Sequence, residues 1–321
     1  LRSLVGSEMC IRDSRHRLSG TIEYYNKYSV DLLAAINGSP TQGFGYTTLM
    51  TNNGKMVNRG VEITLSGEII RQKDFSWNAS LLYAFNRNKV KHISVQPSLW
   101  DSRISMPTSY PMVGKPLYGI YAYKWAGLNE NGDPQVYDAE NNVTSGPARD
   151  YHALVYCGTT VPIHNASLTN VLRYKGFEFS AMLILDAGHK LRSSNIPSIN
   201  MSNGRITSTA KGIVDRWTQP GDVTDVPRLL FSNDTENFNT HRTELYRYSD
   251  LFVYDASNIR LSNISLAYRV PAHWCKKISL SGARLQFNVE NVATFAFDSK
   301  ANYDLGGKVK PNYVWGLYLN F

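Results

Sequence analysis

Residues 312–321 read Asn-Tyr-Val-Trp-Gly-Leu-Tyr-Leu-Asn-Phe, and this stretch decides the fold class of the chain. Its apolar residues recur at every second position: Tyr313, Trp315, Leu317, Leu319 and Phe321. Because successive side chains of a strand point to opposite faces, the pattern predicts a strand with one apolar and one mixed face. A strand of about ten residues with an aromatic-rich outer face is what a transmembrane β-barrel needs to cross the bilayer.

The same alternation recurs along the chain. It is clear in residues 75–90, which begin with Phe75 and Trp77 on one face and polar residues between them. Between Leu261 and Ile264 the apolar phase shifts, which predicts a β-bulge. On this basis we predict about ten strands, in residues 17–32, 57–69, 75–90, 117–128, 133–140, 165–174, 177–187, 258–270, 283–291 and 312–321.

The connections between these strands alternate between long and short. The long ones are residues 33–56, 91–116, 141–164, 188–257 and 292–311, and the short ones are residues 70–74, 129–132, 175–176 and 271–276. Transmembrane barrels have short turns on the periplasmic side and long loops outside, whereas loops in compact soluble domains rarely exceed about 12–15 residues. The fold class that we expect is therefore all-β, an antiparallel transmembrane β-barrel with Phe321 at the periplasmic end.

Composition excludes several other classes of protein. Apolar runs all fall well short of the roughly 18 residues of a transmembrane helix, which excludes a helical membrane protein. The net charge is +8, but the basic residues are scattered rather than gathered in a patch, so nucleic-acid binding is not expected. Three cysteines, Cys10, Cys157 and Cys275, form neither a zinc-binding pattern nor an evident disulfide framework.

The first residues do not fit the rest of the chain. Residues 3–14 read Ser-Leu-Val-Gly-Ser-Glu-Met-Cys-Ile-Arg-Asp-Ser and resemble a translated sequencing-adapter remnant. They have the character of neither a signal peptide nor a strand, so we predict that residues 1–14 are a non-native artefact. Residues 15–321 are then expected to be the carboxyl-terminal part of a larger protein.

Several segments resemble, in order, the SusC/RagA family of TonB-linked outer-membrane transporters. They are residues 53–63 (Asn-Gly-Lys-Met-Val-Asn-Arg-Gly-Val-Glu-Ile), 85–90, 114–118, 125–128, 216–221 (Arg-Trp-Thr-Gln-Pro-Gly), 255–268 (with Asp-x-Ser-x-x-Arg-Leu-x-Asn), 289–292 and 316–321. Each motif is weak alone, but six or more in the right order are fairly specific. The chain departs from the family in a degenerate stretch after residue 130 and in lacking a plug domain and a TonB-contact segment, which truncation would explain.

The resemblance implies a plugged barrel of about 22 strands, of which this chain would supply about ten. The function implied is import of oligosaccharides or peptides across the outer membrane of a Gram-negative bacterium, with no enzymatic step and no cofactor. The partners implied are a SusD-like surface lipoprotein as a lid, the TonB-ExbB-ExbD complex acting through the missing amino-terminal part, and outer-membrane lipid and lipopolysaccharide. The barrel-assembly machinery would read the terminal signal formed by Tyr313, Trp315, Leu317, Leu319 and Phe321.

Candidate sites are few. Residues 129–133 (Asn-Glu-Asn-Gly-Asp) cluster oxygen ligands, but they lack the spacing of a calcium loop, and Asn-Gly favours a tight turn, so we predict a turn and no metal site. The predicted outer loops contain aromatic residues that could stack sugars, grip a peptide or simply pack the loops. The ligand-binding candidates among them are Trp100, Tyr110, Trp217 and Phe231, and further loop aromatics are Tyr151, Tyr156, Phe238 and Tyr246.

Two rival hypotheses remain open at this point. One is an outer-membrane barrel that does not transport, such as an adhesin or an enzyme, although no His-Glu-x-x-His or Gly-x-Ser-x-Gly motif is present. The other is a secreted β-rich carbohydrate-binding module, which would be soluble and folded without detergent.

Overall fold

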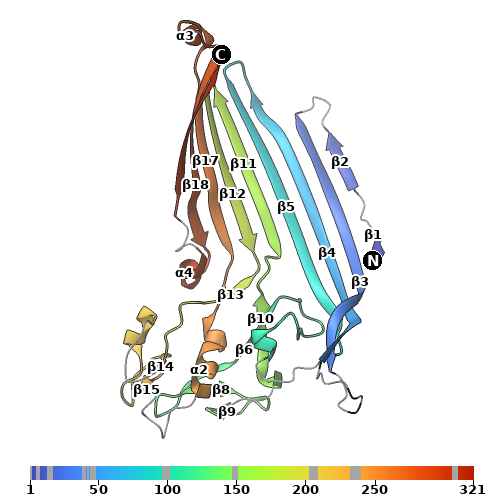
Figure 1. Ribbon diagram of the computed structural model, residues 1–321, viewed down its shortest axis with the longest axis vertical. Helices are drawn as coiled ribbons and strands as arrows, with labels where there is room; N and C mark the ends of the chain where they lie inside the picture. Colours follow the sequence, from blue (N-terminus) through green and yellow to red (C-terminus); the bar gives the residue numbers. More distant parts are fainter. Residues whose placement is uncertain are drawn as a thin grey trace.

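The computed structural model describes residues 2–4, 8–12, 17–37, 41, 43, 48–95, 102–146, 151–201, 209–231, 240–305 and 310–321. Its main feature is one open antiparallel sheet whose long strands lie side by side (Figure 1). In spatial order these strands are β3 (Leu18–Asn37), β4 (Thr48–Arg71), β5 (Phe75–His92), β11 (His164–Tyr174), β12 (Phe177–Ala187), β17 (Asn258–Arg269), β18 (Gly282–Ala296) and β19 (Asn312–Asn320).

The cross-strand register separates an apolar face of the sheet from a polar face. Leu168 on β11 lies between Leu81 on β5 and Leu183 on β12. The next residue, Thr169, belongs to the opposite face and lies between Ser80 and Met182. Lipid-facing and lumen-facing residues alternate in this way along the strands of transmembrane barrels.

The apolar face is exposed rather than covered by a second layer. Large side chains on it, such as Phe179, Leu266, Leu285 and Leu317, expose between 39% and 62% of their surface. A soluble sandwich would bury these side chains against another sheet, because large exposed apolar patches are rare on soluble monomers. The predicted transmembrane fold class is confirmed, and the hypothesis of a soluble carbohydrate-binding module loses its structural basis.

Aromatic side chains border the apolar face at both ends. Phe75, Tyr174, Phe177 and Tyr268 occupy one cross-strand row at the end with the short turns. Phe85 borders the apolar face ten residues further along β5, and the segment from Phe75 to Phe85 is about 34 Å long at ~3.4 Å per residue. A tilt of about 40° reduces this length to about 25 Å, the height of the apolar band between the aromatic girdles of barrels.

Two polar side chains on the apolar face have partners on the same face. The indole Nε1 of Trp77 donates a hydrogen bond of 3.1 Å to Oδ1 of Asn170. The hydroxyl of Tyr83 and Nδ1 of His164 are 2.9 Å apart and share a hydrogen bond. Because an unsatisfied polar group in hydrocarbon costs several kcal/mol, these pairs allow Asn170 and His164 to face lipid.

The terminal strand β19 has the two faces that its sequence predicts. Trp315 lies opposite Phe287 on β18, with the ring centroids 4.2 Å apart, and Leu317 lies opposite Leu285. The alternate side chains of β19 therefore continue the apolar face to the edge of the sheet. Recognition of these residues by the assembly machinery stays a prediction.

Two predicted strands do not join the main sheet. β5 pairs directly with β11, so that residues 93–163 form one long connection. Residues 117–128 and 133–140 instead contribute three short strands of small sheets: β6 (Gly119–Tyr123), β7 (Trp125–Leu128) and β8 (Pro134–Tyr137). The prediction of barrel strands here is wrong, because alternation indicates a strand without naming its partner, and four or five residues are too few to span the roughly 9–11 residues of a bilayer crossing.

The other eight predicted ranges are confirmed as long strands of the sheet. The predicted bulge is confirmed as well, since Met182 pairs with Asn263 and Leu183 with Leu261, leaving Ser262 without a partner in the register. The predicted loop 33–56 is shorter than expected, because β3 extends to Asn37 and β4 begins at Thr48.

The long connections gather at one end of the sheet, and the predicted short turns at residues 70–74, 175–176 and 271–276 lie at the other (Figure 1). The fourth predicted short connection, residues 129–132, instead joins β7 to β8 among the long loops, because these two strands do not belong to the main sheet. No helix in the described ranges is long and apolar enough to cross a membrane. The smaller elements of the connections are α1 (Ser102–Ser105), β9 (Val143–Thr144), η2 (Tyr151–Ala153), β10 (Leu154–Thr159), β13 (Lys190–Arg192), β14 (Asn200–Met201), η3 (Lys211–Asp215), β15 (Leu230–Phe231), α2 (Thr240–Arg247), η4 (Asp250–Phe252), β16 (Val253–Asp255), α3 (Ala272–Lys276), η5 (Ser299–Ala301) and α4 (Asn302–Leu305).

The amino-terminal segment contains two short strands that the sequence does not predict. β1 (Arg2–Leu4) and β2 (Glu8–Arg12) both pair antiparallel with β3. The expectation of no strand here is wrong, because the outer edge of a sheet presents unpaired N–H and C=O groups that can pair with the backbone of any sequence. Such pairing is independent of the segment's origin, so the non-native character of residues 1–14 stays a prediction.

The assignment of faces predicts opposite effects for two adjacent residues. Leu168→Arg should lower the free energy of unfolding by about 2–4 kcal/mol, because the guanidinium would face lipid near mid-depth. Thr169→Arg, on the polar face, should change it by less than about 1 kcal/mol. Equilibrium urea unfolding of the full-length protein in lipid vesicles measures both, and equal losses would contradict the assignment.

Candidate functional site

The long connections fold into a loop assembly with its own apolar cores. One core consists of Tyr121, Tyr123, Val136, Ala153, Leu154 and Leu245, and a second consists of Ile199, Tyr246 and Phe252. Trp125 packs against both cores. The two longest connections, residues 93–163 and 188–257, are therefore packed together at the outer end of the sheet.

Polar contacts attach the loop assembly to the strands where the two meet. Lys190 on β13 forms an ion pair of 3.0 Å with Asp255 on β16. Burial opposes ionisation of Asp255, but hydrogen bonds from Ser257 and Lys190 outweigh it and lower the pKa of Asp255 to about 2. The guanidinium of Arg192 donates to the carbonyl oxygen of Tyr121 at 2.8 Å, which joins β13 to β6.

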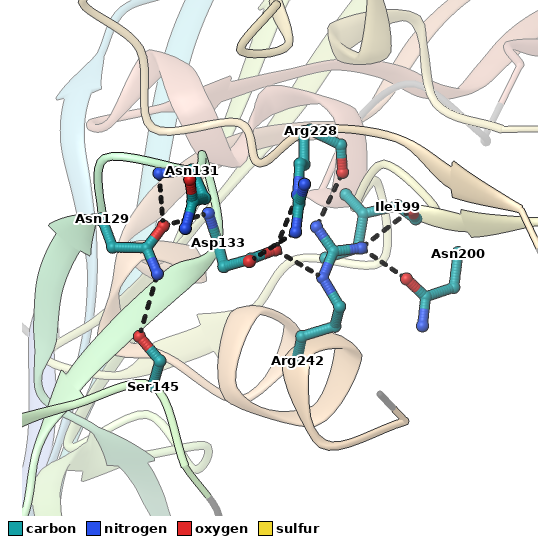
Figure 2. Close-up of polar contacts among 8 residues, drawn as sticks. All are labelled: Asn129, Asn131, Asp133, Ser145, Ile199, Asn200, Arg228 and Arg242. Carbon is teal, nitrogen blue, oxygen red and sulfur yellow. Dashed lines mark hydrogen bonds and ion pairs between the residues drawn. The ribbon is translucent and has the colours of Figure 1, made fainter. Parts of the chain in front are cut away.

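Asp133 is the polar centre of the loop assembly (Figure 2). Its carboxylate accepts two hydrogen bonds from Arg228, at 2.8 and 3.1 Å, and one of 3.1 Å from Nε of Arg242. The side chain of Arg242 is only 3% exposed, and burial lowers its pKa while Asp133 opposes that change. Further hydrogen bonds run from Arg242 to the carbonyl oxygens of Ile199 and Arg228. One carboxylate thus holds together the β7–β8 turn, the β14–β15 pair and α2.

The predicted turn at residues 129–133 is confirmed. Oδ1 of Asn129 accepts hydrogen bonds from the backbone N–H groups of Asn131 at 3.0 Å and Asp133 at 2.8 Å, and Gly132 has a φ of 74° (Figure 2). The carboxylate of Asp133 is engaged by arginines rather than directed to an open site. Across the part of the chain that the structure describes, no group of three or more metal-ligating side chains occurs.

Trp217 joins a second loop to this turn. Its indole ring lies directly over Gly132, so close that any side chain at position 132 would collide with it. Asp222 supports the loop, because its Oδ2 accepts hydrogen bonds from the backbone N–H and the hydroxyl of Thr218 and from the N–H of Gln219. These bonds lower the pKa of Asp222, so its carboxylate is charged at neutral pH.

A cleft of about 650 Å³ opens beside Trp217, and it is our candidate ligand-binding site. Aromatic, amide, carboxylate and hydroxyl groups line it together: Trp217, Asn129, Glu130, Asn131, Asp222 and Thr224. Ligand sites typically combine aromatic surface with a few placed polar groups. The carboxylates of Glu130 and Asp222 favour a neutral or cationic ligand over an anionic one. This local charge is opposite in sign to the net charge of the chain, which is +8.

A second, apolar cavity of about 310 Å³ lies at the outer ends of β3, β4 and β5. Its lining includes Leu32, Leu33, Met50, Met56 and Val90. It contains few polar groups that could orient a ligand, so it is the weaker candidate.

The structure distributes the four predicted ligand-binding residues over separate places. Trp217 lines the 650 Å³ cleft. Tyr110 does not line the apolar cavity itself, although its chain neighbours Ser109 and Pro111 do. Phe231 is half-buried in β15. Trp100 lies outside the described residues. Ligand contact by these residues stays a prediction.

Two further loop aromatics, Tyr246 and Tyr156, pack inside the loop assembly. Tyr246 is 1% exposed and stacks edge-on with Phe252, and Tyr156 packs against Tyr121. Tyr151 has no described side chain, and Phe238 lies outside the described residues. Of the polar residues of the cleft, the sequence analysis considers Asn129, Glu130 and Asn131 only as part of a turn, and it misses Asp222 and Thr224. Asp222 directly follows Pro220-Gly221 and could have been flagged as the cap of that turn.

Curated proteins that match the chain are named TonB-dependent receptors. No family model matches the chain. The chain is 25% identical over 335 residues to TonB-dependent receptor P3 of Formosa agariphila, which covers 98% of this chain and 32% of the receptor. It is 23% identical over 289 residues to TonB-dependent receptor SusC of Bacteroides thetaiotaomicron, which covers 86% of this chain and 26% of the receptor. The chain thus spans about a third or less of the length of these curated relatives.

Among solved structures, the chain is similar to the RagAB peptide transporter. The TM-score is 0.73 at 22% identity, and the match covers 98% of this chain and 34% of that chain. This likeness shows the fold, which is part of a larger barrel. The predicted resemblance to the SusC/RagA family is confirmed, and the relatives are named as receptors and transporters rather than enzymes.

Asp133 should be indispensable to the loop assembly. Asp133→Asn leaves the buried guanidinium of Arg242 without a carboxylate, so we expect a local loss of about 3–5 kcal/mol. Hydrogen exchange of α2 and the β14–β15 pair in the full-length protein measures this loss.

Asp138→Asn is the matched control for that experiment. Asp138 caps an exposed turn through the N–H of Asn142 at 2.7 Å, so its substitution should cost about 1 kcal/mol or less. Equal exchange of α2 in the two variants would show that Asp133 does not hold the loops together.

Proposed function

We propose that this chain is the barrel part of an outer-membrane nutrient importer that depends on TonB and takes up oligosaccharides or peptides. The observation that carries the proposal is the sheet, with its apolar outer face, its polar inner face and its long loops all at one end. The likeness to TonB-dependent receptors over nearly the whole chain supports it. The expected location is the outer membrane of a Gram-negative bacterium.

The polar face of the sheet suits the wall of a transport path. Asp186 accepts hydrogen bonds from Asn165 at 2.7 Å and from Arg260 at 3.0 Å, which links β11, β12 and β17 on this face. Because hydrogen bonds fix these side chains in place, the polar face forms a rigid wall along which a hydrophilic ligand can pass. Movement would then belong to a plug in the lumen rather than to the wall.

The loop assembly would make the first contact with the ligand. Trp217 presents an aromatic surface beside the amides of Asn129 and Asn131, a combination that accepts either sugar rings or peptide. A SusD-like lipoprotein would close over these loops, and TonB would supply the energy for release inward. RagAB is named a peptide transporter, so peptides and oligosaccharides are the two ligand classes to compare.

Uptake by intact cells tests the function. Cells that express the full-length protein and a SusD-like lipoprotein should accumulate a fluorescently labelled oligosaccharide or peptide, and accumulation should stop when TonB is deleted. Uptake that persists without TonB, or no uptake of either class alongside correct insertion, would refute the proposal.

Trp217 provides a residue-level test of the ligand site. Trp217→Ala should weaken ligand binding by about 2 kcal/mol, roughly 30-fold, because a central aromatic contact is lost. Trp217→Phe should retain most of the affinity, since a ring remains over Gly132. Isothermal titration of the full-length protein with the transported ligand measures both values.

Trp274→Ala is the control, because Trp274 is an exposed tryptophan in α3 at the opposite end of the sheet. It should leave the affinity unchanged. If Trp217→Ala behaves like Trp274→Ala, the cleft is not the ligand site, and the role of Trp217 is confined to loop packing.

A further inference from the structure

Three cations gather on the outward face of the sheet, just beyond the outer aromatic border. Arg59 on β4 lies directly opposite Arg87 on β5, and Lys89 follows two positions along β5. Because side chains two residues apart share a face, Arg87 and Lys89 point to the same side as Phe85, which is the apolar side. All three side chains are exposed.

These cations have no counter-charge in the described part of the chain. None of the ion pairs found there includes Arg59, Arg87 or Lys89. Nε of Arg59 donates to the neutral amide oxygen of Asn26, at 3.1 Å. Like charges directly opposite each other destabilise a strand pair. The repulsion between Arg59 and Arg87 in this row of cations thus lowers the free energy of unfolding of the protein without a ligand, and a bound anion would offset this repulsion.

The depth of the row in the membrane identifies the anion. Arg87 lies two residues beyond Phe85, about 7 Å along the strand and about 5 Å further from the bilayer centre once the strand is tilted. This level is the headgroup region, at the end of the sheet that has the long loops. Guanidinium groups bind phosphate through two parallel hydrogen bonds, and lysine adds a compact positive charge.

We propose that Arg59, Arg87 and Lys89 bind the phosphate groups of a phosphorylated glycolipid of the outer leaflet. The acyl chains of this lipid would lie against the apolar face below, beside Phe85 and Val61. The proposal rests on the proposed membrane location but not on transport. It is therefore tested by lipid binding and not by uptake.

The opposite face provides a matched control at the same level. Lys27 on β3 pairs with Asn58 on β4, one residue away from Arg59, and both project to the polar face. Lys27 is exposed, as Arg59 is. Its substitution removes one positive charge at the same depth without touching the lipid side.

Native mass spectrometry of the full-length protein in detergent, with defined added lipids, tests the proposal. The probes are lipid A with two phosphates, the same lipid after enzymatic dephosphorylation, and inorganic phosphate as a competitor. The triple substitution R59Q/R87Q/K89Q should weaken binding of bisphosphorylated lipid A by about 100-fold, at roughly tenfold or less per charge. Lys27→Gln should have no effect, and dephosphorylated lipid A should bind the wild type and the triple variant equally.

The possible results separate the alternatives. Equal binding of the two lipid A forms by the wild-type protein would overturn the proposal, and so would loss of binding in Lys27→Gln. Competition by inorganic phosphate at low millimolar concentration would indicate a free-phosphate site instead and would also overturn it. Absence of binding by any lipid would point to failure of the membrane location itself. Heat-modifiable migration on gels verifies folding. If the triple variant fails to fold, the single substitutions Arg87→Gln and Lys89→Gln take its place, and each should weaken binding of bisphosphorylated lipid A by roughly tenfold or less, while unchanged binding in both would overturn the proposal.

Discussion

Hydrogen bonding of the backbone inside a bilayer is the constraint on which the rest of this structure depends. Hydrocarbon offers no partner to an N–H or C=O group, so each strand has to pair along its length with its neighbours. The long unbroken ladders between β3, β4 and β5 and between β11, β12 and β17 meet this requirement. Once the ladders are in register, the period of two places every alternate side chain toward lipid.

The same register explains details that look anomalous in isolation. Asn170 and His164 face lipid with one polar atom each held by a neighbour across the strand pair, Oδ1 of Asn170 by Trp77 and Nδ1 of His164 by Tyr83. Arg59 and Arg87 oppose each other two residues beyond Val61 and Phe85, at the level where lipid phosphates are proposed to bind them. A polar or charged side chain on the outer face is thus tolerated where a partner is within reach, in the protein or in the headgroups.

Outside the membrane the physical problem changes, and so does its solution. The loop assembly has water as its solvent and buries small apolar cores, with Asp133 and its two arginines as a polar brace between them. A buried ion pair is justified here by geometry, because the carboxylate of Asp133 and the guanidinium of Arg242 use most of their hydrogen-bonding capacity. Trp217 acts in two ways: it packs over Gly132 and also lines the cleft where ligand contact is proposed.

The sequence by itself determined the long strands, their apolar faces, the bulge at Ser262 and the side on which the loops lie. These features are local, since a strand's face follows from alternation over about ten residues. Only the tertiary structure decided which strands are neighbours, so residues 117–140 could be predicted as strand but not excluded from the sheet. It also decided the site, because Trp217 meets Gly132 and Arg228 meets Asp133 across a sequence separation of 85 to 95 residues. No periodicity encodes such contacts; they arise when two loops that emerge from the same end of a sheet pack against each other.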